Sequence, residues 1–195
     1  MHLEKSNLMN QFKDNAVTGT SFGILLALSF SHLANDTLQS VISAVYPMLK
    51  ESLALSFAQI GLITLVYQIS ASVFQPVVGF YLDKRPNPWF LPVGMTFTMT
   101  GLTTLAFAHT VTLTVVAVFL VGIGSSILHP EASRLTSIAS GGKRGMAQSL
   151  FQVGGNLGGS LGPLLVALII APYGQKHIAL FSILSVICIL VMIPI

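Results

Sequence analysis

The chain has 195 residues, of which 53% are hydrophobic and 8% are charged, and its formal net charge is +3 at pH 7. Soluble domains carry about 25% charged residues, and several apolar stretches here are long enough to cross a bilayer, so the composition predicts an integral membrane protein. The basic residues are scattered over short loops, which argues against nucleic-acid binding. The single cysteine, Cys188, excludes a disulfide framework and a cysteine metal cluster.

Six apolar segments predict six membrane-spanning helices. They cover residues 22–48, 57–82, 89–108, 111–131 with a continuation to 138, 146–171 and 178–195. We therefore expect an all-α, integral membrane six-helix bundle over residues 22–195. Residues 1–21 are expected to form a cytoplasmic amino-terminal segment, and the span after them is too long for the core of a cleaved signal peptide.

The basic residues are divided unevenly between the two sides of the predicted bundle. With a cytoplasmic amino terminus, only Lys50 and Lys176 lie on the outer side, and seven lie on the inner side: Lys5, Lys13, Lys84, Arg85, Arg134, Lys143 and Arg144. Cytoplasmic loops are enriched in Lys and Arg, so this distribution predicts that orientation.

Polar side chains inside the spans fall into two layers when depth is counted at 1.5 Å per residue. The layer near the midplane contains His32, Asp36, Gln68 and Asn156. The layer near the cytoplasmic mouth contains Gln75, His129, Glu131 and Gln148. Because these residues belong to the first, second, fourth and fifth spans, we expect those helices to surround a substrate cavity, with the third and sixth outside it.

His32, Asp36 and Gln39 share one face of the first predicted helix. A charge at the bilayer centre costs about 2.5–3.5 kcal/mol on insertion scales, so an intramembrane carboxylate is expected to serve a function. Histidine and a desolvated aspartate both exchange protons in an accessible pH range, and we interpret Asp36 with His32 as a proton-coupling site. The alternative is an internal hydrogen bond that only stabilises helix packing.

Pro130 lies between His129 and Glu131 in the fourth predicted span. It leaves the carbonyl of Ser126 without its helical donor, so we expect a kink or break there, and broken helices often border transport sites. Glu131 and Arg134 are three residues apart on one face. They form either an inner gate or anion site together with His129, or a plain salt bridge.

Glycines recur at every fourth residue of the fifth predicted span, at Gly154, Gly158 and Gly162, and Pro163 follows. This spacing predicts close packing against a neighbouring helix. A separate polar stripe of the same span either lines the cavity or joins helices, and it contains Gln148, Gln152 and Asn156.

The loop Gly79-Phe80-Tyr81-Leu82-Asp83-Lys84-Arg85 resembles the inner-loop signature of the major facilitator superfamily, in which Gly79, Asp83 and Lys84 match positions of a conformational motif. Gly158, Gly162 and Pro163 resemble the fifth-span motif of its antiporters. Longer runs are similar to the amino-terminal half of the bacterial fosmidomycin resistance transporters. They are Ser31-His32-Leu33-Ala34-Asn35-Asp36, Gln75-Pro76-Val77-Val78-Gly79, His129-Pro130-Glu131 and Gln148-Ser149-Leu150-Phe151-Gln152-Val153-Gly154-Gly155-Asn156.

This resemblance implies one half of the twelve-span major facilitator fold. It also implies a proton-driven efflux antiporter of the bacterial inner membrane that exports a phosphonate antibiotic, with the proton gradient as its energy source and no cofactor or metal. The expected partners are a small-molecule drug, protons and the lipid bilayer. Because superfamily members contain two six-span bundles, we expect either a fragment whose carboxy-terminal half is missing or a parallel homodimer of half-transporters.

Parts of the sequence are also compatible with two other classes of protein. Gly122-Ile123-Gly124-Ser125-Ser126 faintly resembles an intramembrane serine protease, but that chemistry needs a histidine base within reach, and the sixth span carries none. A membrane assembly protein without transport activity is the other class, which reconstituted transport would exclude. The sequence therefore predicts a transporter and not an enzyme.

Overall fold

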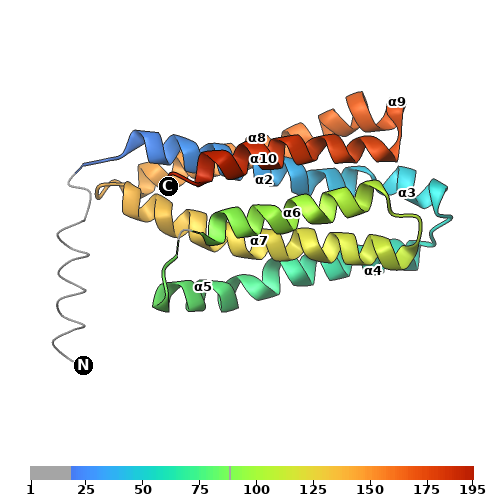
Figure 1. The fold of residues 1–195 in the computed structure, drawn as a ribbon, viewed down its shortest axis with the longest axis horizontal. Coiled ribbons are helices and arrows are strands. Elements are labelled where there is room, and N and C mark those ends of the chain that lie inside the picture. The colour runs from blue at the N-terminus through green and yellow to red at the C-terminus, as the bar shows by residue number, and fades with distance from the viewer. Residues whose placement is uncertain (1–18, 88) are drawn as a thin grey trace.

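The computed structural model describes residues 19–87 and 89–195, so most of the expected amino-terminal segment, residues 1–18, lies outside the described residues. All regular secondary structure in the described part is helical, which confirms the all-α prediction. The long helices lie side by side along one axis and are joined by short turns (Figure 1).

Six long helical segments follow one another in the described part of the chain, close to the six predicted spans. The first is α2 (Phe22–Ala44) with α3 (Tyr46–Ser52), and the second is α4 (Phe57–Gln68), η1 (Ile69–Val73) and α5 (Phe74–Lys84). The third is α6 (Phe90–Ala106) and the fourth is α7 (Val111–Ala139). The fifth is α8 (Arg144–Leu165), η2 (Val166–Ile170) and α9 (Ala171–Tyr173), and the sixth is η3 (Gln175–Leu180) with α10 (Phe181–Met192).

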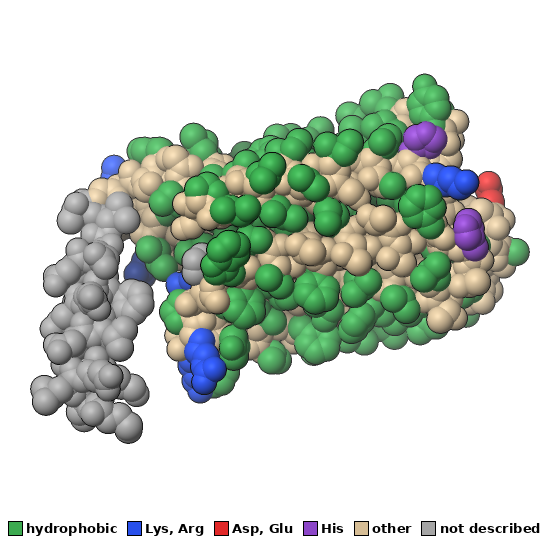
Figure 2. Space-filling view, in the orientation of Figure 1, with side chains coloured by type: hydrophobic (Ala, Val, Ile, Leu, Met, Phe, Trp, Pro, Cys, Tyr) green, Lys and Arg blue, Asp and Glu red, His purple; other side chains and the backbone are tan. Residues whose placement is uncertain are grey.

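The outer surface of these helices is suited to lipid. Four continuous segments are long and apolar enough to cross a membrane, namely Phe57–Lys84, Val111–Ala139, Arg144–Tyr173 and Gln175–Met192. The helix α6 is a shorter apolar helix, and α2 has 23 residues but carries several polar ones in its middle. Hydrophobic side chains cover much of the visible side of the bundle, and Lys and Arg side chains lie at its two ends (Figure 2).

Prolines lie within or just after several of the long helices. The helix α7 continues through Pro130 to Ala139, so of the predicted kink or break, the break does not occur. Neighbouring helices stabilise a membrane helix around a proline, and here α5 lies against it, with Pro130 Cβ 3.7 Å from where a Cβ of Gly79 would be. The turns η1 and η2 are instead π-helical, and they end shortly before Pro76 and Pro172. A π turn is one way to accommodate the hydrogen bond that a proline removes.

Glycines allow α8 to lie directly on α2. A Cβ at Gly158 would be 3.0 Å from the Leu33 carbonyl carbon and 3.0 Å from the Thr37 nitrogen, and one at Gly162 would be 2.7 Å from the Thr37 oxygen. A Cβ at Gly154 would collide with the Ser29 carbonyl oxygen. Such close backbone approach is the usual role of small residues spaced four apart in membrane helices.

The helices α2, α4, α7 and α8 surround the central cavity described below, as the sequence predicts. The other two long segments pack on the outside, with α6 against α7 and α10 against α6 and α2. A second close seam joins α6 to α7, where a Cβ at Gly101 would be 2.6 Å from the Ala117 carbonyl oxygen.

Substitution of Gly158 tests the α2–α8 seam. Gly158→Val should lower the free energy of unfolding by at least about 1–3 kcal/mol, because the added atoms overpack a backbone contact. The matched control is Gly159→Val, since position 159 has no other atom within 4 Å of an added Cβ. The measurement is thermal unfolding of the purified variants in detergent, and equal loss of stability in both variants would contradict the seam.

Candidate functional site

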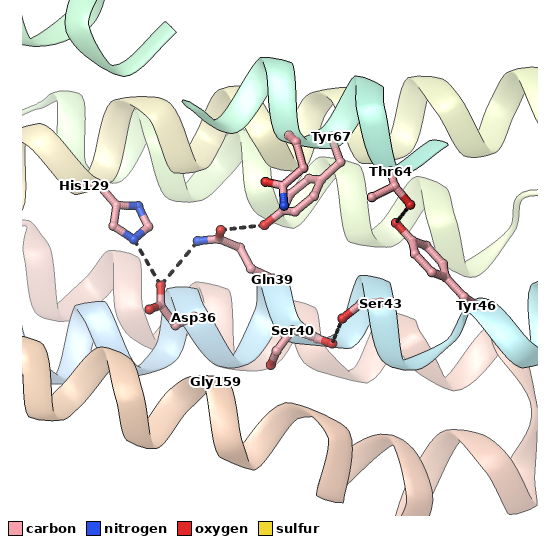
Figure 3. Close-up of a pocket in the computed structure, with 10 residues that line it drawn as sticks. Asp36, Gln39, Ser40, Ser43, Tyr46, Thr64, Tyr67, His129 and Gly159 are labelled. Carbon is pink, nitrogen blue, oxygen red and sulfur yellow. Dashed lines mark hydrogen bonds and ion pairs between the residues drawn. The ribbon is translucent and has the colours of Figure 1, made fainter. Parts of the chain in front are cut away.

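A polar cavity of about 320 Å³ lies inside the bundle between α2, α3, α4, α7 and α8 (Figure 3). Nine of its ten lining residues have polar side chains; the ten are Asp36, Gln39, Ser40, Ser43, Tyr46, Thr64, Tyr67, Gln68, His129 and Gly159. A larger cavity of about 560 Å³ between α2–α3 and α8–α9 is mainly apolar, with Glu51 as its charged residue. The polar cavity is therefore the candidate site for binding a polar solute.

Asp36 is the centre of the charged groups in this cavity. Its Oδ2 lies 3.2 Å from His32 Nε2, one helical turn earlier on α2. Its Oδ1 lies 3.2 Å from Nε2 of His129 on α7. The His32 side chain is 3% exposed, whereas Asp36 and His129 are each 24% exposed and line the cavity. One carboxylate thus joins a buried imidazole to an accessible one.

Backbone carbonyl groups hold both imidazole rings through their other nitrogen. His32 Nδ1 donates to the carbonyl oxygen of Phe151 on α8 at 2.8 Å, and His129 Nδ1 donates to that of Ser125 at 3.0 Å. The Phe151 ring also stacks on His32, with centroids 4.0 Å apart and an interplanar angle of 16°. Since a carbonyl oxygen only accepts, each Nδ1 carries a hydrogen and each Nε2 is directed at Asp36.

Gln39 extends the network from Asp36 to two other helices (Figure 3). Its Nε2 donates to Asp36 Oδ1 at 3.4 Å, while its Oε1 accepts from Tyr67 of α4 at 2.6 Å and from Ser125 of α7 at 3.1 Å. Tyr67 is a site residue that was not predicted from the sequence. Its position next to Gln68 in an apolar span was the available signal.

Gly155 provides the space for the cluster. A Cβ at this position would lie 2.6 Å from His32 Nε2 and 2.8 Å from Asp36 Oδ2. Any larger residue would therefore displace one of these two side chains. The sequence shows Gly155 only as one glycine in a run of several, so its role depends on the rotation of α8 against α2.

His129 lies beside Asp36 and not with Glu131 in a separate layer at the cytoplasmic mouth, which corrects the predicted depth. The predicted layer takes Glu131 as the inner edge of the fourth span, whereas α7 follows the predicted continuation and ends at Ala139. His129 is thus ten residues, about 15 Å, from the inner end of its helix. Counting from the true end places it near the midplane.

Glu131 is fully buried and forms a bidentate ion pair with Arg134. Arg134 Nε donates to Oε2 at 2.8 Å and Nη2 donates to Oε1 at 2.6 Å, which is the geometry of a strong charge-assisted pair. Both charges are therefore compensated within one helix, as the salt-bridge interpretation describes.

The other predicted site residues are spread along the bundle. Gln148 joins α8 to α7 by hydrogen bonds to the Ser133 carbonyl oxygen at 3.0 Å and to Ser137 Oγ at 3.1 Å. Gln68 is exposed and lines the cavity, and Gln75 is half-buried on α5. Two of the polar side chains predicted on α8 are exposed and do not line this cavity: Gln152 and Asn156.

The residues of the inner-loop motif lie at the end of α5. Gly79 faces Pro130 of α7, and Asp83 and Lys84 are exposed. The Lys84 ammonium lies 3.9 Å from the centroid of the Phe80 ring, a cation–π contact. The motif is thus at the end of the bundle that also carries Lys143 and Arg144.

Two alternative chemistries can be compared with the geometry of the cluster. Three possible metal-ligand atoms of His32, Asp36 and His129 lie within 4.8 Å of one another, and Asp36 also lies 3.2 Å from each imidazole. Ser125 Oγ lies 3.2 Å from His129 Nδ1. Because that nitrogen donates to a carbonyl group, it has no lone pair to accept the proton of a serine nucleophile.

Comparisons of the sequence with known proteins identify relatives that are about twice as long. A profile of the Major Facilitator Superfamily matches residues 28–195. The chain is 55% identical over 173 residues to the fosmidomycin resistance protein of Escherichia coli strain K12, covering 89% of this chain and 43% of that protein. It is 45% identical over 171 residues to an uncharacterized MFS-type transporter of Bacillus subtilis strain 168, covering 88% of this chain and 42% of that transporter. The chain spans less than half of either relative.

Solved structures of transporters have the same arrangement of helices. A mutant of the peptide transporter POT in complex with alafosfalin has a TM-score of 0.77 at 20% identity, covering 94% of this chain and 41% of that chain. A bacterial homolog of the human lysosomal transporter Spinster, inward-facing and unoccupied, has a TM-score of 0.72 at 18% identity, covering 90% and 43%. At these identities the likeness shows the fold alone.

The Glu131–Arg134 pair predicts unequal effects of its single substitutions. Arg134→Gln leaves a fully buried carboxylate without its partner and should cost about 3–5 kcal/mol, whereas Glu131→Gln leaves a partly exposed guanidinium and should cost less. The double variant should be more stable than Arg134→Gln alone. Unfolding of the purified variants in detergent measures this. Wild-type stability of Arg134→Gln together with loss of transport would instead support a gate.

Proposed function

The chain belongs to the major facilitator superfamily, whose members are transporters and not enzymes, and we propose that it forms the amino-terminal bundle of a proton-coupled drug efflux antiporter. The observation that supports the coupling is the contact of Asp36 with two imidazoles at the wall of a polar cavity. Ionisable groups inside a membrane protein commonly mark ion pathways and proton relays.

The substrate that we propose is a fosmidomycin-type phosphonate. The support is the 55% identity to a fosmidomycin resistance protein over nearly all of this chain. The hydroxyl and amide groups of the cavity offer hydrogen bonds to a polar solute of this kind. In the proposed cycle of alternating access, Asp36 with His32 releases a proton inward while the drug moves outward.

The proposed location is the bacterial inner membrane with a cytoplasmic amino terminus. The carboxy-terminal end of α5, where Lys84 and Arg85 lie, is at the same end of the bundle as the start of α8, where Lys143 and Arg144 lie, whereas α3, which contains Lys50, is at the opposite end (Figure 1). This asymmetry follows the positive-inside rule when the first of these two ends faces the cytoplasm.

A complete transporter of this superfamily needs a second bundle, and we propose that the carboxy-terminal half of a longer protein supplies it. Gln152 and Asn156 are exposed on the membrane-spanning part of α8, where lipid would leave their amides without partners. A second bundle or an aqueous path between two bundles would satisfy them. A parallel homodimer is the alternative arrangement, and cysteine crosslinking between α8 helices in membranes distinguishes the two.

Substitution of Asp36 tests proton coupling in the transporter that carries both bundles. Asp36→Asn removes the carboxylate but keeps its shape, so export driven by an imposed pH gradient should fall to the level of vesicles without transporter. Glu51→Gln is the matched control, because Glu51 is an exposed carboxylate at the end of α3. The measurement is fosmidomycin uptake by everted membrane vesicles. Retention of pH-dependent uptake by Asp36→Asn would show that protons are coupled elsewhere.

A further inference from the structure

We infer that His129 is a second proton-binding group of the Asp36 site, so that the cluster exchanges two protons in each cycle. This inference rests on the proposed function only for the transport cycle; the number of protons bound by the cluster follows from its geometry. The sequence predicts His129 only as a residue of the cavity or gate. Among the described residues, Asp36 is the carboxylate that contacts it.

The backbone contacts of the two rings determine which ring nitrogen carries the hydrogen. Each Nδ1 donates to a backbone carbonyl oxygen, that of Phe151 for His32 and that of Ser125 for His129. In its neutral form each ring therefore has its lone pair on Nε2. Both lone pairs are directed at the carboxylate of Asp36, each at 3.2 Å.

The two contacts with Asp36 determine the number of protons that this geometry needs. Without an added proton, an ionised carboxylate faces two lone pairs, and neither 3.2 Å contact contains a hydrogen. One proton satisfies one contact and leaves the other repulsive. Two protons place a hydrogen in each contact, either on Nε2 or on the carboxyl group. The structure, with both contacts at 3.2 Å, therefore corresponds to the cluster with two protons bound. Release of both protons changes the charge of the cluster from +1 to −1.

The groups that pack around the cluster do not supply these protons. On α2, the amides of Asn35 and Gln39 donate to Asp36 Oδ1 at 3.4 Å. From α4, the Tyr67 hydroxyl is occupied with Gln39. On α7, the carboxylate of Glu131 is held by Arg134. The helix α8 contributes a carbonyl group and Gly155, and neither titrates.

Of the two helices that pack outside the four cavity helices, α6 has no titratable side chain. From α10, Cys188 Sγ contacts the Ser31 carbonyl oxygen at 4.0 Å. Among the described residues, the ion-pair partners of Asp36 are thus the two histidines.

The two protons have different access and different consequences. His129 and Asp36 line the cavity, whereas His32 is 3% exposed behind them. Protons from the cavity therefore reach His129 or Asp36 before His32. The contact of His32 with Asp36 lies within α2, but that of His129 joins α2 to α7. Loss of the second proton therefore removes a link between two helices, which couples proton release to their relative movement.

Nitrogen NMR of ¹⁵N-histidine in the protein in lipid nanodiscs tests the proton count directly. His32→Asn and His129→Asn assign the two signals, and His109→Asn, an exposed loop histidine, is the control. We expect both rings to keep the hydrogen on Nδ1 at every pH at which the protein is folded, and the Nε2 signal of His129 to change with pH. A neutral His129 with its hydrogen on Nε2, or a His129 that does not titrate, would overturn the inference.

The stoichiometry of transport provides a second test in the reconstituted transporter with both bundles. The ratio of protons to drug should fall from two to one in His129→Gln and stay at two in His109→Gln. An unchanged ratio in His129→Gln would overturn the inference. If no proton-coupled transport occurs but His129 still binds and releases a proton, the proposed function fails while the proton count of the cluster holds.

Discussion

A carboxylate inside an apolar helix bundle needs hydrogen-bond donors that compensate its charge. The carboxylate of Asp36 imposes this requirement at the centre of the structure, and the arrangement of the surrounding helices meets it. Burial of an isolated charge costs far more than a protein domain can tolerate, so each carboxylate oxygen requires a donor. Imidazoles from α2 and α7 occupy both oxygens at 3.2 Å, and amide groups add weaker contacts. Because the imidazoles are themselves fixed by carbonyl groups of α7 and α8, satisfying one carboxylate links three helices.

The backbone packing of α8 on α2 makes this compensation possible. Gly154 and Gly158 allow the two helices to approach until the Phe151 carbonyl group reaches His32, and Gly155 leaves the space that the imidazole and carboxylate fill. A helix with ordinary side chains at these positions would lie farther away, and His32 Nδ1 would lose its acceptor. The glycines therefore determine the orientation of an ionisable group as well as the packing distance.

The sequence predicted those features that depend on one helix at a time. Apolar length gave the spans, and helical spacing placed His32 and Asp36 on one face. Contacts between helices were harder to predict from the sequence, because they depend on how the helices are shifted and rotated relative to one another. His129 was assigned to the wrong layer because its depth was counted from Glu131, whereas α7 follows the continuation of the span and ends at Ala139. For the same reason, nothing in the sequence related Tyr67 or Gly155 to Asp36, although both lie within the network.

The Glu131–Arg134 pair and His129 both lie on α7, and a single residue separates His129 from Glu131. The two respond differently to a proton. An arginine stays protonated at any physiological pH, and Arg134 binds Glu131 through two hydrogen bonds. That pair has a fixed charge and rigidifies one helix. The contact of His129 with Asp36 exists only when a proton lies between them, and it joins two helices that border the cavity. A proton that enters or leaves the cavity therefore acts on the arrangement of α2 and α7 through His129 and leaves the Glu131–Arg134 pair unchanged.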